Sequence, residues 1–184
     1  PVPGAELAGI HYLRTFSDVE RMRPEMIPGR RCVIVGGGYI GLEVAATCRE
    51  CGVEATVLDA ADRVMSRAVS PWVSDFHARE HANRGVDIRC SARVIAFHPA
   101  PVAAAIQPGT ARVATVELGD GTLVPADFVL VAIGVTPNDA LARAAGLECD
   151  DGILVDEYCR TSDPVIFAAG DCARHPSPHY GARV

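Results

Sequence analysis

The chain has 184 residues, of which 49% are hydrophobic and 22% are charged. This composition predicts a folded core in one domain, or in one domain with part of a second, and it argues against a disordered chain. The formal net charge of −6 argues against nucleic acid or an anionic membrane as a partner. No apolar run reaches the roughly 18 residues of a transmembrane helix, so we expect no membrane partner.

Hydrophobic periodicity and turn residues predict strands that alternate with helices. The expected strands are, in chain order, 10–13, 32–35, 53–58, 86–88, 92–97, 113–118, 123–124, 128–133, 153–155 and 165–169. The expected helices are a short one that begins at the capping box Ser17–Glu20, one at 42–51, one from Ser70-Pro71 to Gly85 with an apolar stripe of Trp72, Val73 and Phe76, and one at 140–145. A Pro- and Ala-rich stretch at 98–110 predicts a surface loop.

Several of the predicted strands are wholly apolar, which is typical of a parallel sheet that is covered on both faces. We therefore expect an α/β fold with a Rossmann-like, doubly wound parallel sheet. Gly119-Asp120-Gly121 lies between two of the strands and predicts an antiparallel β excursion.

A glycine-rich turn, Gly36-x-Gly38-x-x-Gly41, follows the strand at 32–35 and opens the helix at 42–51. This context is the one that a dinucleotide-binding turn requires, since the first glycine permits a sharp turn and the second lets a pyrophosphate approach the backbone. The third glycine allows helix and strand to pack closely, and the helix N-terminus offers free N–H groups to phosphates. The alternative is an ordinary strand–helix turn.

Asp59 ends the next predicted strand, at the spacing expected for the acid that accepts the adenosine ribose hydroxyls. Because a carboxylate repels a 2′-phosphate, NAD is favoured over NADP. Arg63 and Arg67 follow closely and weaken this preference, because an arginine here could bind a 2′-phosphate or point to solvent. Glu43 is either an exposed helix residue or a contact of the nicotinamide.

The cysteines and histidines have alternative interpretations as well. Seven irregularly spaced cysteines without a secretion signal predict reduced thiols and a cytoplasmic location. Cys48 and Cys51 form a C-x-x-C pair, which we interpret as core residues, with a redox role as the alternative. One such pair cannot build a closed zinc site, and His77 and His81 are expected on a solvated helix face, so we expect no metal site.

The string from Arg31 to Ala46 resembles the NAD-binding domain of FAD-dependent pyridine nucleotide oxidoreductases, and more narrowly the ferredoxin, putidaredoxin and rubredoxin reductase branch. Further stretches that resemble this branch are His11–Thr15, Arg63–Met65, Ser70-Pro71, Ile133–Asn138 and Arg160–Asp171. Within the last of these, Thr161 and Ala168-x-Gly170-Asp171 are similar to the second flavin fingerprint of the family. The likeness covers essentially the whole chain.

The resemblance implies an enzyme that takes hydride from NADH onto FAD and passes single electrons to a ferredoxin or rubredoxin. It implies that Gly36, Gly38, Tyr39 and Gly41 bind the pyrophosphate and Asp59 the ribose. Ile40, Glu43 and Gly134 would line the nicotinamide site, Asp171 would bind FAD, and Arg67 is a further cofactor-binding candidate. No catalytic acid or base is expected, since the cofactors supply the chemistry.

The resemblance also implies two domains: residues 1–137 as the NAD-binding domain with its entry linker, and residues 138–184 as the return segment of an FAD-binding domain. The chain carries one glycine fingerprint where the family has two. We therefore expect that the chain alone does not hold FAD and is inactive by itself. An apolar strand edge at 165–169 would invite pairing between chains, so a homodimer is possible.

Overall fold

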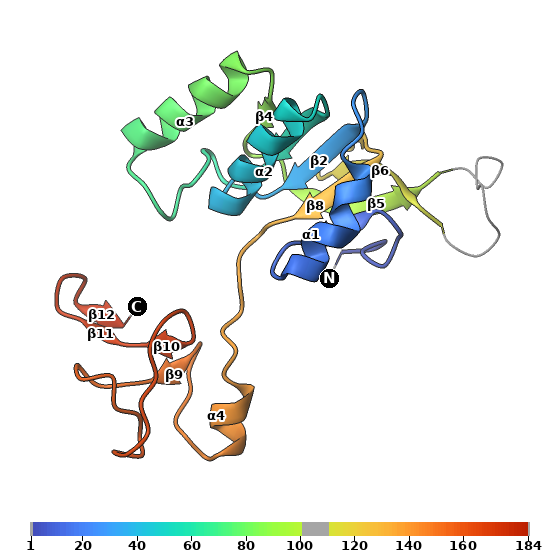
Figure 1. Ribbon diagram of the computed structural model, residues 1–184. Coiled ribbons are helices and arrows are strands. Elements are labelled where there is room, and N and C mark those ends of the chain that lie inside the picture. The colour runs from blue at the N-terminus through green and yellow to red at the C-terminus, as the bar shows by residue number, and fades with distance from the viewer. Residues whose placement is uncertain (1, 101–110, 184) are drawn as a thin grey trace. The chain divides into compact units, whose positions relative to one another are not determined.

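The computed structural model describes residues 2–100 and 111–183 (Figure 1). The chain divides into two compact units, Pro1–Gly134 and Val135–Val184, close to the boundary predicted at residue 137. The assignment of the second unit to an FAD-binding domain stays a prediction. Most of the loop predicted at 98–110 lies outside the described residues.

The described part of the first unit contains a five-stranded sheet in the order β1-β8-β2-β3-β4, and each pair of neighbours is parallel. Its strands are β1 (Ile10–Tyr12), β2 (Arg31–Val35), β3 (Glu54–Leu58), β4 (Asp87–Arg89) and β8 (Phe128–Val131). The helices are α1 (Phe16–Met22), the 3₁₀ helix η1 (Arg23–Glu25), α2 (Tyr39–Glu50) and α3 (Pro71–Asn83). The predicted parallel α/β sheet is confirmed.

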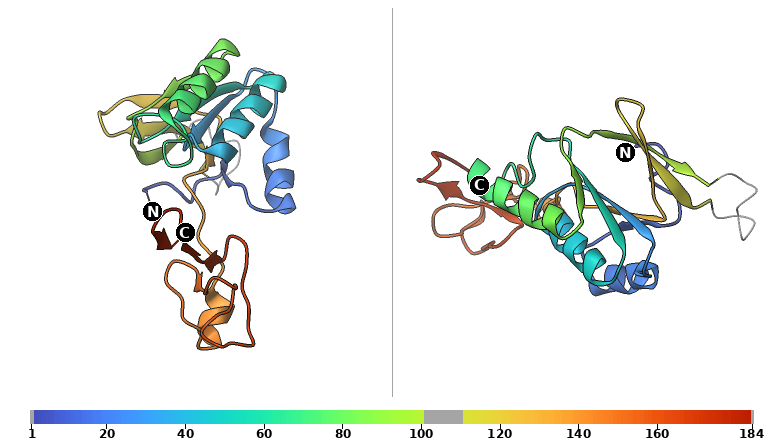
Figure 2. Two further views of the ribbon diagram at one scale, coloured as in Figure 1. Left: turned by 90° about the vertical axis from the view of Figure 1, so that its left-hand side faces the viewer. Right: turned by 90° about the horizontal axis from the view of Figure 1, so that it is seen from above.

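The excursion between β4 and β8 forms an antiparallel sheet of β5 (Val94–Pro99), β6 (Val113–Leu118) and β7 (Leu123–Pro125). Figure 2 shows α2 and α3 side by side on one side of the parallel sheet and this second sheet on the other. Side chains of β2 alternate accordingly, because successive residues of a strand point to opposite faces. Ile34 packs with the helices and Val33 with the antiparallel sheet, and both are fully buried.

Helix α1 begins two residues earlier than its predicted capping box implies. The carboxylate of Asp18 accepts hydrogen bonds from the backbone N–H of Thr15 at 2.6 Å and from its hydroxyl at 2.8 Å. Thr15 is therefore the N-cap, and the prediction of Ser17 was wrong. These bonds, led by the one from the Thr15 backbone, hold the pKa of Asp18 at about 2. The start of the helix also places Met22 in the core.

Helix α3 starts at the predicted Ser70-Pro71 but does not bury the predicted apolar stripe. The side chain of Trp72 is 74% exposed and that of Phe76 47% exposed, whereas Ser74 is buried. Burial of a serine is tolerated here because its hydroxyl donates a hydrogen bond of 2.6 Å to the carbonyl oxygen of Val64. The face of α3 that carries Ser74 therefore turns inward without leaving this hydroxyl unpaired.

The second unit consists of α4 (Ala140–Ala144) and four two-residue strands: β9 (Ile153–Leu154), β10 (Ala173–Arg174), β11 (Pro176–Ser177) and β12 (Ala182–Arg183). The strand predicted at 165–169 is absent from this part of the described chain. Phe167 forms only an isolated bridge with Arg160, and Val165 and Phe167 are largely exposed. The prediction of a strand was wrong because apolar residues without strand partners do not form a ladder. Asp171 accordingly precedes β10 in a turn, not a helix.

A charge cluster joins η1 to the parallel sheet. The carboxylate of Glu25 forms ion pairs with Arg30 and Arg112 and lies 3.6 Å from Nε2 of His11. Burial alone would raise the pKa of Glu25, but the hydrogen bond from Arg112 and the two guanidinium charges outweigh burial and lower it. Burial lowers the pKa of His11, although Glu25 opposes this effect. The cluster is therefore built around a charged Glu25.

We expect Glu25→Gln to lower the free energy of unfolding by about 1–3 kcal/mol at pH 7, because two guanidinium groups lose their carboxylate. A lowered pKa means that the stabilisation is present above the ordinary value of 4.5 and is lost as the pH falls through the folded-state pKa. Urea unfolding at pH 7 and pH 3 should therefore show a smaller pH effect in the variant than in the parent. The exposed Glu20→Gln is the control, and an equal pH effect in Glu25→Gln would contradict the prediction.

Candidate functional site

Three strands of the parallel sheet end side by side. Val35, the last residue of β2, pairs with Leu58 of β3 and with Val131 of β8. The backbone N–H of Gly36 donates a hydrogen bond of 2.8 Å to the carbonyl of Leu58. The residues that follow the three strands, among them Gly36 and Asp59, therefore lie along one edge of the sheet.

The strand order also creates a switch point at this edge. From β2 the chain proceeds through β3 and β4 on one side, whereas β8 lies on the other side of β2. Open α/β sheets bind ligands in the crevice outside the carboxyl ends of the strands at such a point. The glycine-rich turn follows β2, and Gly134 follows β8, so both predicted segments flank the switch point.

Two glycines of the turn are required by the fold itself. Gly36 has a φ of +107°, and a Cβ added there would lie 2.3 Å from the carbonyl oxygen of Ala132. A Cβ on Gly41 would lie 2.0 Å from the carbonyl oxygen of Gly36. Gly36 therefore lets the turn lie close to the chain that follows β8, and Gly41 lets α2 pack against the end of β2.

Gly38 is different, because nothing in the fold requires a glycine there. It is the N-cap of α2 with extended backbone angles, and an added Cβ would meet no atom within 4 Å. The space beside Gly38 is thus open, and it adjoins the first turn of a twelve-residue helix that carries no acidic residue in that turn. Free N–H groups and the positive end of the helix dipole meet there, which suits a pyrophosphate.

Asp59 lies beside the turn and is held in place by the backbone. Its Oδ2 accepts a hydrogen bond of 2.7 Å from the N–H of Gly37, and its Oδ1 accepts one of 2.8 Å from the N–H of Ala61. A carboxylate has about four acceptor sites, so two remain for sugar hydroxyls. The sequence did not indicate that Asp59 would also anchor the glycine turn.

The other predicted residues occupy separate places. Tyr39 and Ile40 lie in the first turn of α2 and are 57% and 39% exposed, and Glu43 is exposed one turn further on. Arg67 is exposed in the loop between β3 and α3. Asp171 belongs to the second unit, where it is exposed.

The family model for pyridine nucleotide-disulphide oxidoreductases matches residues 1–183. The chain belongs to this family. It is 46% identical over 169 residues to putidaredoxin reductase of Pseudomonas putida, which covers 92% of the chain and 38% of that protein. It is 44% identical over 174 residues to a ferredoxin–NAD(+) reductase component of the anthranilate 1,2-dioxygenase system of Burkholderia cepacia, with 95% and 40% covered.

A solved structure of a covalent putidaredoxin reductase–putidaredoxin complex is similar to the chain with a TM-score of 0.88 at 43% identity. The match covers all of the chain and 44% of that protein. The chain therefore spans about two fifths of the length of the two relatives named above.

The C-x-x-C pair of this family member does not form a facing pair of thiols. Cys48 is fully buried in the core, where its sulfur lies 3.9 Å from the sulfur of Met26, whereas Cys51 is exposed at the end of α2. A hydrogen bond with Cys48, together with burial, raises the pKa of the Cys32 thiol. Cys48 and Cys32 of β2 belong to the same buried cluster, so the core interpretation fits Cys48 but not the exposed Cys51.

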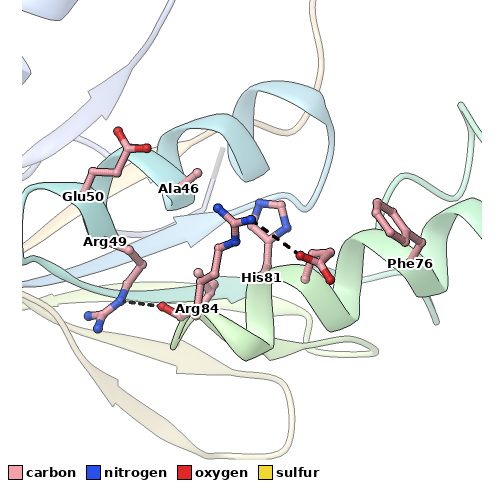
Figure 3. Close-up of a pocket in the computed structure, with 8 residues that line it drawn as sticks. Ala46, Arg49, Glu50, Phe76, His81 and Arg84 are labelled. Carbon is pink, nitrogen blue, oxygen red and sulfur yellow. Dashed lines mark hydrogen bonds and ion pairs between the residues drawn. The ribbon is translucent and has the colours of Figure 1, made fainter.

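A groove of about 480 Å³ lies between α2 and α3, away from the glycine turn (Figure 3). His81 lies between the two helices, with its Nδ1 2.9 Å from the carbonyl of His77 and its Nε2 3.1 Å from that of Leu42. The prediction of a solvated face was therefore wrong for His81. Both ring nitrogens of His81 are close to backbone carbonyls of the two helices, and none of the residues predicted to bind a cofactor lines the groove. The groove is therefore not the candidate site.

We expect Gly41→Ala to destabilise the first unit by roughly 1–3 kcal/mol or more, because the new Cβ would clash with the carbonyl of Gly36. Gly38→Ala should destabilise by no more than about 1 kcal/mol, since its Cβ enters open space and only the weaker N-cap preference of alanine opposes it. Urea unfolding followed by circular dichroism measures both variants against the parent. Equal destabilisation by the two alanines would contradict the geometry of the turn.

Alkylation of the folded chain should label Cys51 and leave Cys48 unmodified, because only the first thiol is exposed. Iodoacetamide treatment followed by peptide mapping in a mass spectrometer measures the modification at each site, and the same reaction in denaturant provides the control. A Cys48–Cys51 disulfide formed under mild oxidation would contradict this expectation and would favour thiol–disulfide chemistry.

Proposed function

We propose that this chain is the NADH-binding part of an FAD-dependent, ferredoxin-type reductase, and that NADH binds at the turn from Gly36 to Gly41. The observation that carries the proposal is the open space beside Gly38. It lies at the N-terminus of α2 and at the switch point of the sheet. Close contacts explain Gly36 and Gly41, whereas the open space beside Gly38 leaves room for a ligand to approach the backbone.

In this proposal the first unit binds and orients the dinucleotide. The N–H groups at the start of α2 hold the pyrophosphate, and Asp59 accepts hydrogen bonds from the ribose hydroxyls. Ile40, Glu43 and Gly134 line the nicotinamide site, where positioning and exclusion of water are the contributions of the protein. Bound NADH and FAD would supply the hydride and electron chemistry, so no side chain is proposed as an acid or a base.

The printed names of the relatives support the identity of the acceptor. One relative is named a ferredoxin–NAD(+) reductase component, and another is a reductase solved in a covalent complex with putidaredoxin. By this similarity we propose a small iron–sulfur protein, a ferredoxin or rubredoxin, as the electron acceptor of the whole protein. Seven free thiols favour a reducing compartment, and a cytoplasmic location is part of the proposal. None of the described helices is long and apolar enough to span a bilayer.

The second unit is proposed to belong to an FAD-binding domain, with Asp171 as the residue that accepts hydrogen bonds from the flavin side chain. Among its described residues, Ala142 and Val155 are the buried hydrophobic ones, whereas Tyr158, Val165 and Phe167 are largely exposed. Such a unit has little core of its own. Its exposed apolar side chains fit a segment that packs against further parts of a domain, or against a second chain in a homodimer.

A second candidate function is that of a nucleotide-binding module without turnover, which describes the chain when it is separated from the rest of the protein. This candidate shares the NADH site and differs only in lacking the flavin step. A third, thiol–disulfide reduction at Cys48 and Cys51, is disfavoured by the burial of Cys48 and the exposure of Cys51.

We expect Asp59→Asn to weaken NADH binding about tenfold or more, because hydrogen bonds to a charged group contribute about 1.5–3 kcal/mol. NADPH binding should weaken less or improve, since the change removes a negative charge near its 2′-phosphate. The remaining amide oxygen can still accept the hydrogen bond from Gly37, whereas the amide NH2 group cannot accept the one from Ala61. Isothermal titration with both nucleotides measures the effect.

The exposed Asp62→Asn is the matched control, because it removes the same charge from the same segment without a backbone partner in the turn. It should leave both dissociation constants within about twofold. An equal loss of NADH and NADPH binding in Asp59→Asn would contradict the ribose assignment.

A further inference from the structure

The segment from Ala61 to Val69, called the strap below, connects β3 to α3 and is built into the core. Val64 is 1% exposed and Met65 5% exposed, and both pack in the helix-side core. Met65 has a φ of +52°, a left-handed conformation that residues other than glycine hold only where surrounding contacts impose it. The strap is therefore an ordered structure and not a loose connection.

The strap is bonded directly to the glycine turn. The N–H of Met65 donates a hydrogen bond of 2.9 Å to the carbonyl of Gly37, while the N–H of the same Gly37 donates to Asp59. A Cβ on Gly37 would lie 2.9 Å from Cγ1 of Val64 and 2.9 Å from Oδ2 of Asp59. The position of the Gly37 peptide, and with it that of the Asp59 carboxylate, thus depends on the strap.

Arg63 closes the strap on itself. Its guanidinium donates hydrogen bonds of 3.0 Å to the carbonyl of Val69 and of 2.8 Å to the carbonyl of Ser66. The backbone between these residues forms one turn, in which the N–H groups of Ala68 and Val69 bond to the carbonyl of Met65. Both NH2 groups of Arg63 are therefore directed to carbonyl oxygens of its own segment.

Ser74 anchors the strap from the other side. Its hydroxyl is buried in the first turn of α3 and bonds to the carbonyl of Val64 at 2.6 Å. A continuous set of hydrogen bonds thus runs from α3 through the strap to the glycine turn and Asp59. A change at Arg63 or Ser74 would reach the ribose side of the site through this set.

We infer that Arg63 is a positioning residue that determines the selectivity of the site for NADH over NADPH, an inference that rests on the proposed function. By closing the strap it keeps the Asp59 carboxylate fixed against the ribose. The same bonds keep its own guanidinium away from a 2′-phosphate. Loosening the strap therefore weakens NADH binding and at the same time relieves the repulsion of NADPH, so the ratio of the two affinities falls.

The test is Arg63→Gln in the full chain, with the dissociation constants of NADH and NADPH measured by isothermal titration. If the closed strap is populated in only 10–20% of molecules, the NADH constant rises about five- to tenfold. The constant for NADPH stays within about twofold or falls, so the selectivity ratio drops at least about fivefold. Arg63→Lys, whose ammonium can still reach a carbonyl, recovers part of the ratio.

Arg79→Gln is the matched control, because Arg79 is an exposed arginine of α3 whose guanidinium forms an ion pair with Asp75 at 2.8 Å. It leaves both constants unchanged. Ser74→Ala removes the other anchor of the strap and lowers the ratio in the same direction, and it decides the question if Arg63→Gln does not fold. An unchanged ratio in the folded variants overturns the inference, as does equal weakening of both nucleotides.

Nucleotide binding by the unmutated chain shows whether a negative result contradicts the proposed NADH site or only the role of Arg63. A parent that binds neither nucleotide refutes the NADH site itself. A parent that binds NADH in preference to NADPH, with variants that keep this preference, refutes only the role of Arg63.

Discussion

The carboxylate of Asp59 is the interaction on which the candidate site depends, because it joins two segments that the sequence separates. One oxygen holds the peptide of Gly37 and the other holds that of Ala61. The glycine turn, the end of β3 and the strap are thereby fixed relative to one another before any ligand is present. A preorganised site of this kind spends little binding free energy on ordering its own loops.

Both faces of the parallel sheet in the first unit are covered, so the candidate site lies at the edge where the carboxyl ends of its strands meet. Helices cover one face and the antiparallel sheet covers the other, and β2 alternates its side chains between them. At the carboxyl edge the chain connections lead in opposite directions from β2 and β8, and open α/β sheets bind ligands at such a switch point. The second unit has few buried side chains of its own among the described residues, which agrees with a chain that spans only part of its relatives.

The errors of the sequence-based predictions have physical causes. Ser17 matched a capping box, but Asp18 reaches back to Thr15, because a carboxylate at the third helical position can bond there just as well. In α3, Ser74 is buried while Trp72 and Phe76 are exposed, and the carbonyl of Val64 in the strap accepts the hydrogen bond of the serine hydroxyl. Residues 165–169 have strand composition but no neighbouring strand in the described chain, and β propensity without a partner is a weak determinant.

The sequence by itself determined the apolar strands, the glycine turn after β2 and the acid at the end of β3, because these features are set by local periodicity and spacing. It also determined which glycines permit the close packing of α2. Only the tertiary structure decided that Gly38 faces open space, that Cys48 is buried in the same cluster as Cys32 while Cys51 is exposed, and that Asp59 anchors the turn. Each of these facts depends on contacts between residues far apart in the chain, and such contacts exist only once the strands have taken their register.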